Sequence, residues 1–294
     1  MASRIAKYNA RTDTESAETL AVRDIASGGG WALFEYTCSA GPHDRPFEEQ
    51  HGYTSIAAVV EGTFNYRSST GSALLYPGAF LLGNAGTCFE CGHEHGHGDR
   101  SISLRCEPEF IGEIAATAAG SSRFRFPTAS TPAARRLQAA LAHMELAAGA
   151  GDGLACDELA IEVAQSVLAH TSGATDTTPA LSARDIRRVA DVLHHIERNS
   201  AEALRLDDLA GIAGMSRFHF LRTFRPVTGV TPHAHVLALR LRRAALALGT
   251  TTDAVTAIAF DAGFGDLSTF NARFRSVFGE PPTRWRARHS RRRA

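Results

Sequence analysis

Hydrophobic positions recur with two different periods, and the change from one to the other divides the chain. Between residues 31 and 105 the apolar residues form short runs of strand length, separated by turn signals such as Glu61-Gly62 and Pro77-Gly78. The runs begin at Trp31, Tyr53, Phe64, Ala73 and Ala79. Short strands with regularly spaced turns predict an antiparallel β-sandwich or β-barrel.

From residue 131 onward the apolar residues follow a helical period instead. The segments 133–148 and 154–170 each carry an apolar stripe and predict two helices. These stripes fit either a dimer interface or packing against the chain's own β domain. Residues 171–179, TSGATDTTP, have the composition of a linker.

The chain is therefore expected to be an α+β protein of several domains. An antiparallel β-barrel with a helical pair comes first, and an all-helical domain follows. The expected boundaries are a lead-in at 1–27, a β domain that also dimerises at 28–172, a linker at 173–181, a helical domain at 182–288 and a basic tail at 289–294.

The helical domain repeats one supersecondary pattern. The segments 206–232 and 255–282 each read as a short apolar helix, a glycine turn, a second helix with a Phe–Arg pair, and a closing Gly and Pro. Such a pattern predicts two helix-turn-helix units, which place two helices in successive major grooves of DNA. Double-stranded DNA is the leading partner on this evidence.

The charge distribution supports a nucleic-acid partner for this half of the chain. The formal net charge is zero, but residues 181–294 contain 19 Arg and 10 acidic residues, whereas the first 180 residues are correspondingly acidic. A basic half beside an acidic half is a recognised indication of nucleic-acid binding by the basic half.

In the first unit Ser216 is the expected N-cap of the second helix. Phe220, Phe224 and Val227 fall on one face and are expected in the core. The opposite face is expected to contact DNA and carries Arg217, Phe218, Leu221, Arg222 and Arg225. Arginine on such a face pairs with guanine or, more commonly, binds phosphate.

In the second unit Gly263 supplies the turn and Asp266 the cap. Phe270, Phe274 and Phe278 recur every four residues and are expected in the core. The DNA-facing positions of this helix are expected to be Leu267, Ser268, Thr269, Asn271, Ala272 and Arg273.

Residues 182–285 resemble the DNA-binding domain of AraC/XylS-type transcription regulators. The resemblance rests on LAGIAGMSRFHFLRTFRPVTGVTP in the first unit and DAGFGDLSTFNARFRSVFGEPPTRWR in the second. It implies a sequence-specific, effector-responsive regulator that works with RNA polymerase, more often as an activator than as a repressor. It also assigns base reading to Phe218, Leu221 and Arg222 in the first helix, and to Ser268, Thr269 and Ala272 in the second. Because the second set lacks bidentate donors, it is expected to depend more on phosphates and DNA shape.

A cysteine and histidine cluster forms the second unusual feature, in the stretch CFECGHEHGHGDR. Cys88, Cys91, His93, His95 and His97 are candidate ligands for zinc, iron or copper, with His51 and Cys106 as neighbours from other strands. Strand alternation places Cys91, His93, His95 and His97 on one side and Cys88 on the other. The same residues also fit the wall of a ligand pocket or a thiol redox switch. Asp99 and Arg100 are expected to hold the loop by ion pairs.

The β region resembles the cupin-type sensor that such regulators often carry. VVEGTFNY followed by YPGAFLLG has the strand–turn–strand rhythm of that fold, although the ordered cupin metal pattern is not reproduced. The resemblance implies a small-molecule or metal effector, with aromatic residues such as Trp31, Phe34, Tyr36, Phe64 and Tyr66 lining a pocket. The alternatives are a metal-dependent cupin-type enzyme or a thiol-based DNA-repair methyl acceptor; we expect no enzyme.

The expected location is the cytoplasm. The chain has no 18-residue apolar run, and its first residues lack the apolar core of a signal peptide. Its five cysteines are odd in number and do not form a disulfide framework, which fits a reducing compartment.

Overall fold

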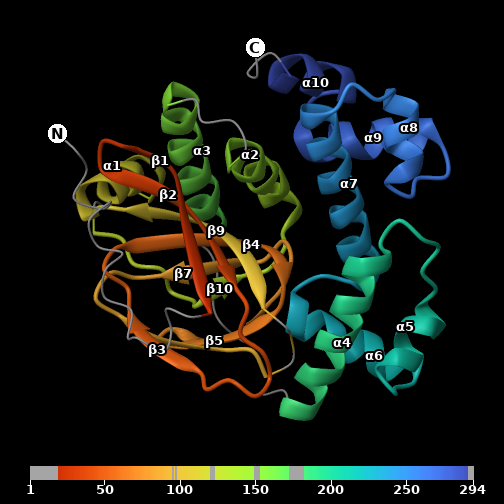
Figure 1. The fold of residues 1–294 in the computed structure, drawn as a ribbon, viewed down its shortest axis with the longest axis horizontal. Coiled ribbons are helices and arrows are strands. Elements are labelled where there is room, and N and C mark those ends of the chain that lie inside the picture. Colours follow the sequence, from red (N-terminus) through yellow and green to blue (C-terminus); the bar gives the residue numbers. More distant parts are fainter. Residues whose placement is uncertain are drawn as a thin grey trace. The chain divides into compact units, whose positions relative to one another are not determined.

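The computed structural model describes residues 19–94, 96, 98–119, 123–148, 153–171 and 182–290. The chain forms two compact units, and neither unit is continuous in sequence. The first comprises residues 1–132 and 151–180, and the second comprises residues 133–150 and 181–294. Figure 1 labels most of their elements.

The first unit is built on two antiparallel sheets. One has the strand order β1-β2-β9-β4-β7-β10, and the other has the order β3-β8-β5-β6. The strands are β1 (Leu20–Gly28), β2 (Trp31–Cys38), β3 (Phe47–Gln50), β4 (Thr54–Gly62), β5 (Phe64–Ser68), β6 (Gly71–Leu75), β7 (Phe80–Gly83), β8 (Cys88–Gly92), β9 (Asp99–Cys106) and β10 (Ser130–Thr131). The predicted antiparallel β domain is thus confirmed, in the form of two facing sheets.

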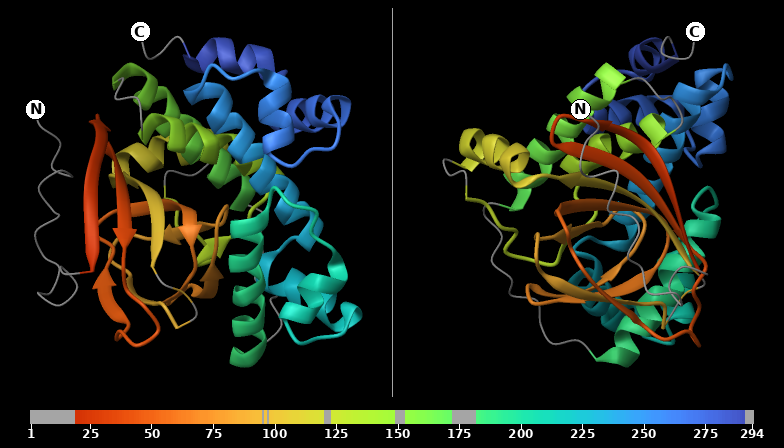
Figure 2. Two further views of the ribbon diagram at one scale, coloured as in Figure 1. Left: turned by 45° about the vertical axis from the view of Figure 1, so that its right-hand side comes forward. Right: turned by 60° about the vertical axis from the view of Figure 1, so that its left-hand side comes forward.

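Two helices complete the first unit, α1 (Pro108–Ala119) and α3 (Gly153–Thr171). They pack on each other, and α3 also lies against β1 (Figure 2). The Trp31 indole N–H donates to Asp157 Oδ1 at 2.7 Å and joins β2 to α3. The apolar stripe of α3, including Val163, Val167 and Leu168, is buried within the chain.

The second unit is helical, and its elements match the two predicted helix-turn-helix units. The helices from α4 onward are α4 (Ala183–Asn199), α5 (Leu206–Ile212), α6 (Arg217–Thr228), α7 (Pro232–Thr250), α8 (Val255–Asp261), α9 (Leu267–Phe278) and α10 (Pro282–Ser290). Buried aromatic rings form its core, among them Phe220, Phe224, Phe270, Phe274 and Trp285. The predicted core residues of both second helices are buried except Val227 of α6, which is half-buried.

A helix from the middle of the chain also belongs to the second unit. Helix α2 (Gln138–Ala148), preceded by the 3-10 turn η2 (Arg135–Leu137), packs against α7 and α9. Ala142 joins the buried core around Phe274, and His143 stacks on Trp285 with ring centroids 4.8 Å apart. The unit boundary therefore differs from the expected β-domain range of 28–172, because the α2 stripe is covered by the helical domain.

The expected lead-in, linker and basic tail are only partly covered by the described residues. Residues 20–28 form β1, so the lead-in expected at 1–27 is shorter than predicted, and its residues 1–18 lie outside the described part. The expected linker, 173–181, also lies outside it. Of the expected tail 289–294, residues 289 and 290 close α10 and the rest are not described. Within the described ranges, no helix combines the length and apolar character needed to cross a membrane.

Candidate functional site

The second helix of the first helix-turn-helix unit, α6, presents one polar face to solvent. Arg217, Arg222 and Arg225 are exposed on it, and Leu221 is 38% exposed. The opposite face carries Phe220 and Phe224, both fully buried. The face predicted to contact DNA is therefore accessible at these four positions; the Phe218 side chain lies outside the description.

In the second helix-turn-helix unit, α9 likewise has one buried and one exposed face. Ser268, Thr269, Asn271, Ala272 and Arg273 are exposed. Leu267 is half-buried and packs against the aromatic core, so it differs from the other five predicted contacts.

Capping and turn chemistry fix where each exposed helix begins. The Ser216 hydroxyl accepts from the backbone N–H of His219 at 3.3 Å, and the Asp266 carboxylate accepts from that of Thr269 at 2.7 Å. Both are the side-chain caps that were predicted. Gly263 turns with φ +90°, and a side chain there would collide with the carbonyl of Ala201. Only glycine suits this position.

The arginines of the linking helix α7 have a structural place instead. Arg240 Nε donates to the Ser200 carbonyl at 2.6 Å, and Arg243 donates to the carbonyl of Glu197. Arg242 Nε lies 3.3 Å from Glu145 Oε2 of α2, with both side chains at least 93% buried. These contacts tie α7 to α4 and α2, so Arg240, Arg242 and Arg243 have structural partners within the unit.

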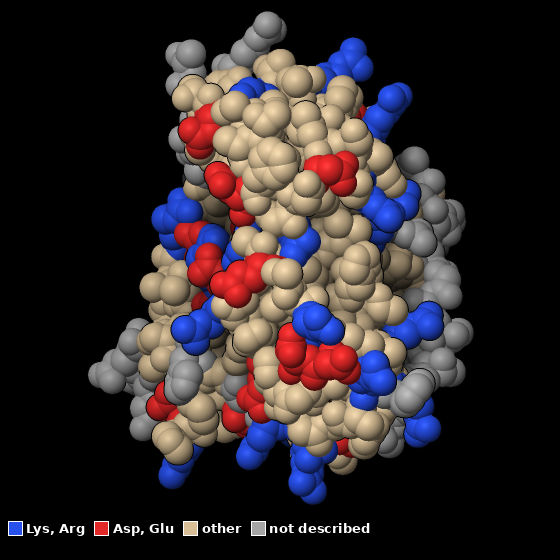
Figure 3. All heavy atoms as spheres, turned by 90° about the vertical axis from the view of Figure 1, so that its right-hand side faces the viewer, with Lys and Arg blue, Asp and Glu red and all other residues tan. Residues whose placement is uncertain are grey.

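Exposed acidic and basic side chains lie close together on this unit. Asp207 and Asp208 lie on the short helix α5, and Asp207 pairs with Arg217 at 3.2 Å. Figure 3 shows basic side chains interspersed with acidic ones on the face it presents. Because acidic side chains interrupt the basic ones, this unit is expected to contact DNA through individual arginines and not through a continuous basic surface.

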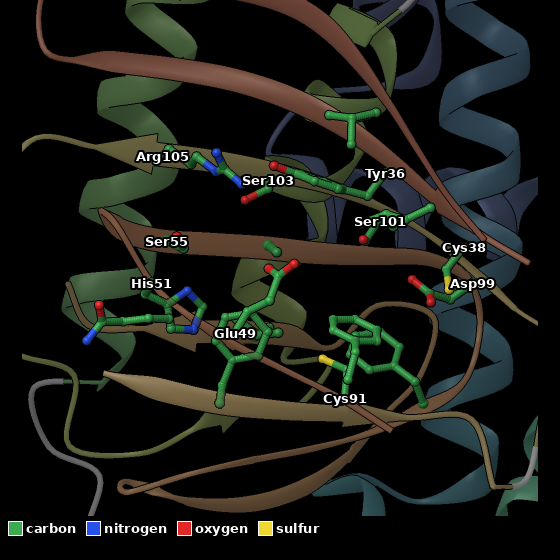
Figure 4. A pocket seen from close by; sticks show the side chains of 18 of the residues that line it. Tyr36, Cys38, Glu49, His51, Ser55, Cys91, Asp99, Ser101, Ser103 and Arg105 are labelled. Atoms are coloured by element: carbon green, nitrogen blue, oxygen red, sulfur yellow. The ribbon is translucent and has the colours of Figure 1, made fainter. Parts of the chain in front are cut away.

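The first unit contains a pocket of about 630 Å³ between its two sheets. Along β9, Asp99, Ser101, Ser103 and Arg105 line the pocket, and Ile102 and Leu104 between the last three of them are buried (Figure 4). Since a strand rises about 3.3 Å per residue, Asp99 and Arg105 mark two ends about 20 Å apart. The pocket is thus elongated, with a basic end and an end that holds thiols and a carboxylate.

The basic end combines cationic and aromatic groups. The Arg105 guanidinium lies over the rings of Phe34 and Tyr36, 4.9 and 5.4 Å from their centroids. Burial raises the pKa of Tyr36 to about 12, against the opposing charge of Arg105, so the phenol keeps its proton. Ser55 and Ser103 add hydroxyl groups, and Glu49 adds a carboxylate.

His51 lines the pocket next to this end as a neutral imidazole. Burial lowers its pKa to about 4, and the charge of Arg105 acts in the same direction. Its Nε2 lies 2.8 Å from the Tyr66 hydroxyl, and its ring stacks on Phe89 at 4.2 Å. His51 therefore supplies a fixed wall and hydrogen-bonding group near neutral pH.

At the other end, Cys38, His93 and Asp99 come together. Their donor atoms all lie within 4.8 Å of one another, and His93 Nε2 lies 2.8 Å from Asp99 Oδ1. Burial lowers the pKa of His93, but hydrogen bonds to Asp99 and Cys38 outweigh it and raise the pKa to about 9. His93 is accordingly an imidazolium at neutral pH, held in a buried ion pair.

The predicted cysteine and histidine ligands are only partly brought together. Cys91 and His93 line the pocket, as strand alternation predicted, whereas Cys88 is exposed and does not line it. His95 and His97 lie outside the described residues. Burial, and next the charge of Asp99, raises the pKa of the Cys91 thiol. A buried protonated thiol is a poor fit to a redox switch.

Several pocket residues escaped the sequence-based prediction, above all Cys38, Glu49 and Arg105. The polar alternation in DRSISLRC was a usable signal, because its apolar positions Ile102 and Leu104 indicate that the polar positions face another side. Of the predicted aromatic residues, Tyr36 and Phe64 line the pocket, whereas Trp31 and Tyr66 are buried in the core. Asp99 and Arg100 do form ion pairs, Asp99 with His93 and Arg100 with Glu35 and Glu61, but Asp99 also lines the pocket.

Two family models match the chain, over separate segments. An AraC-like ligand binding domain matches residues 35–164, and a helix-turn-helix domain matches residues 209–288. The first match contains the pocket-lining residues other than Leu20 and Val22, and the second contains α6 and α9.

Known proteins are similar over the same segments. The Transposon Tn10 TetD protein of Escherichia coli is 38% identical over 98 residues, which cover 33% of this chain and 71% of that protein. The transcriptional activator NphR of a Rhodococcus species is 27% identical, and the match covers 96% of each chain. The crystal structure of the AdpA DNA-binding domain with target DNA is 30% identical, with a TM-score of 0.35, and the match covers 36% of this chain and 96% of that one.

Proposed function

The chain belongs to the AraC family of transcription regulators, and from this premise we propose that it reads a specific DNA site with α6 and α9 in response to an effector bound between its two sheets. One observation carries the DNA-reading proposal. Two capped helices each bury an aromatic face and expose a polar one, at equivalent places of two consecutive helix-turn-helix units.

The two helices are expected to contribute unequally. On α6, Arg222 is the proposed base-reading donor, flanked by the exposed Leu221, while the exposed Arg217 and Arg225 are proposed to bind phosphates. On α9 the exposed residues are mostly short: Ser268, Thr269, Asn271 and Ala272, with Arg273 for phosphate. The half-site under α6 should therefore tolerate fewer base changes than the half-site under α9.

Selection from random double-stranded DNA tests this proposal. The full-length protein should enrich two conserved segments about one helical turn apart. Arg222→Ala should relax base preference in one segment only, whereas Arg273→Ala should weaken binding to all sequences alike. Enrichment of a single segment, or unchanged preference in Arg222→Ala, contradicts the proposed roles.

The pocket is the proposed effector site. Its length and polar lining fit an extended small molecule with an anionic group at Arg105 and hydroxyl or carbonyl groups near Ser55 and Ser103. The rings of Phe34 and Tyr36 lie beneath the Arg105 guanidinium and restrict the orientation of that guanidinium. This restriction lowers the entropic cost of binding an anion there.

An effector screen with a matched pair of variants tests the site. Small carboxylates should raise the unfolding temperature of the wild-type protein and change its DNA affinity, and Arg105→Gln should abolish both effects. Arg67, an exposed arginine of β5 that does not line the pocket, gives the control Arg67→Gln, which should respond as the wild type does. Equal responses in both variants place the effector elsewhere.

The remaining parts of the proposal concern partners. We propose that the bound protein activates transcription through RNA polymerase, and that it acts in the cytoplasm because its target is the chromosome. A homodimer stays a proposal, and it requires another surface than the α3 stripe, which the chain itself covers. We propose no catalytic role. Turnover by the isolated protein with iron would instead favour the cupin-type enzyme, and methyl transfer from alkylated DNA to a cysteine would favour the repair protein.

A further inference from the structure

Cys38, His93 and Asp99 form a cluster of three different metal-ligating side chains at one end of the pocket. We propose that this cluster binds one divalent metal ion of the zinc type, through the Cys38 thiolate, the His93 imidazole and the Asp99 carboxylate. The site differs from a Cys-x-x-Cys site at Cys88 and Cys91, since only Cys91 of that pair faces the pocket.

The donor chemistry fits such an ion. Zinc accepts sulfur, nitrogen and oxygen ligands, and sites with three protein ligands keep a fourth position for water or a bound molecule. The donor atoms lie within 4.8 Å of one another, close enough to converge on one ion. A thiolate and a carboxylate also balance the double positive charge, so the buried site is neutral.

The backbone places two of the ligands independently of any metal. Cys38 and Asp99 are directly opposed partners in the antiparallel pair β2–β9. Gly98, just before Asp99, turns with φ +80° and lies so close to the Cys38 carbonyl that a side chain would collide with it. The strands therefore hold the thiol and the carboxylate together before an ion arrives, which reduces the entropic cost of binding.

Binding exchanges protons for the ion. Thiol and imidazole ligands bind a metal ion in their deprotonated forms, so binding releases protons to solvent, and the metal takes the place of His93 as the partner of Asp99. The three ligands line the pocket, so the fourth position faces its interior. This part of the inference rests on the proposed effector role of the pocket. An extended effector would place a donor group on the ion and its anionic end at Arg105.

Cobalt titration of the reduced, metal-free full-length protein tests the site directly. Co²⁺ should bind with a stoichiometry of about one and give thiolate-to-cobalt charge-transfer absorption. The absorption should be lost in Cys38→Ser, and the affinity should fall at least about tenfold in Asp99→Asn. The matched controls Cys88→Ser and Cys91→Ser should bind as the wild type does.

Two results overturn the proposal. Wild-type protein without charge-transfer absorption means that His93 and Asp99 form a purely structural ion pair. Absorption that survives Cys38→Ser but disappears in Cys88→Ser or Cys91→Ser places the metal on the Cys-x-x-Cys pair.

A second measurement needs no variant and covers a failure of Cys38→Ser to fold. In the wild-type protein, Zn²⁺ should protect Cys38 from alkylation by iodoacetamide, as measured by peptide mass analysis, while Cys88 stays reactive. Protection of Cys88 and Cys91 without Cys38 overturns the proposal. DNA affinity measured on the same samples keeps the outcome separate from the proposed DNA-reading function.

Discussion

Replacing Glu145 by Gln tests the attachment of α2 to the DNA-reading unit. Glu145 of α2 pairs with Arg242 of α7 at 3.3 Å, and the two side chains are only 5% and 7% exposed. The substitution keeps the shape of the side chain and removes its charge. The guanidinium then stays buried without this carboxylate.

The burial of both partners sets the expected magnitude. Removing one partner of a buried ion pair costs about 3–5 kcal/mol, because the remaining charge stays desolvated. Replacing both partners by methionine should recover most of that loss, since a buried pair contributes little relative to well-packed apolar side chains. The exposed pair Arg217–Asp207, with side chains 60% and 56% exposed, provides a control that should change stability by less than about 1 kcal/mol.

Urea unfolding followed by Trp285 fluorescence measures these differences. Trp285 is 1% exposed and stacks on His143 of α2, so its emission reports the docking of α2 on this unit. Trp31 is the second of the two tryptophans, and a Trp31→Phe background removes its signal. A Glu145→Gln protein that is as stable as Asp207→Asn would refute the reasoning, and would mean that α2 does not dock as the structure has it.

Three further predictions concern the DNA-reading unit. Arg222→Ala should weaken binding to the selected DNA site by about 1–3 kcal/mol in a titration at fixed salt, with little change on unrelated DNA; an equal loss on both would make it a phosphate contact. Phe274→Ala should destabilise the unit by about 3–5 kcal/mol in thermal unfolding, because the ring is fully buried against Phe278 and Trp285, and an unchanged melting temperature would contradict this core assignment. Burial, and next the charge of Arg242, lowers the pKa of His235 to about 3, so the unfolded chain binds the proton first as the pH falls below about 6.5. Stability should drop by about 2 kcal/mol between pH 7 and pH 5, and His235→Phe should flatten this acid limb; an equal slope in both proteins would contradict the cause.

The helical unit was predictable because its signals are local. The caps Ser216 and Asp266, the turn at Gly263 and the spacing of Phe270 and Phe274 lie within a few residues of the contacts that they specify. Such short-range signals can be recognised without knowledge of the tertiary structure. The second helix of each helix-turn-helix unit and its buried aromatic residues were therefore predicted correctly.

The pocket was not predictable in the same way, because strand register assembles it. Cys38 and Asp99 are far apart in sequence and meet only through the pairing of β2 with β9. The concentration of Cys and His at 88–97 predicted a metal site within that stretch. In the structure, however, Cys88 is exposed and His93 pairs with Asp99.

The placement of α2 had a related cause. Its apolar stripe indicated that some surface must cover it, but the stripe alone does not specify which. The structure assigns part of that surface to α7 and α9, through Ala142, Leu146 and the Glu145–Arg242 pair.

A hydroxyl-radical footprint of the full-length protein on its selected DNA site tests the central claim most directly. Two units that read successive major grooves predict two protected windows about one helical turn apart, on one face of the duplex. Arg222→Ala should weaken protection in one window before the other. A single window, or protection spread evenly over unrelated DNA, would contradict the proposal that α6 and α9 read DNA together.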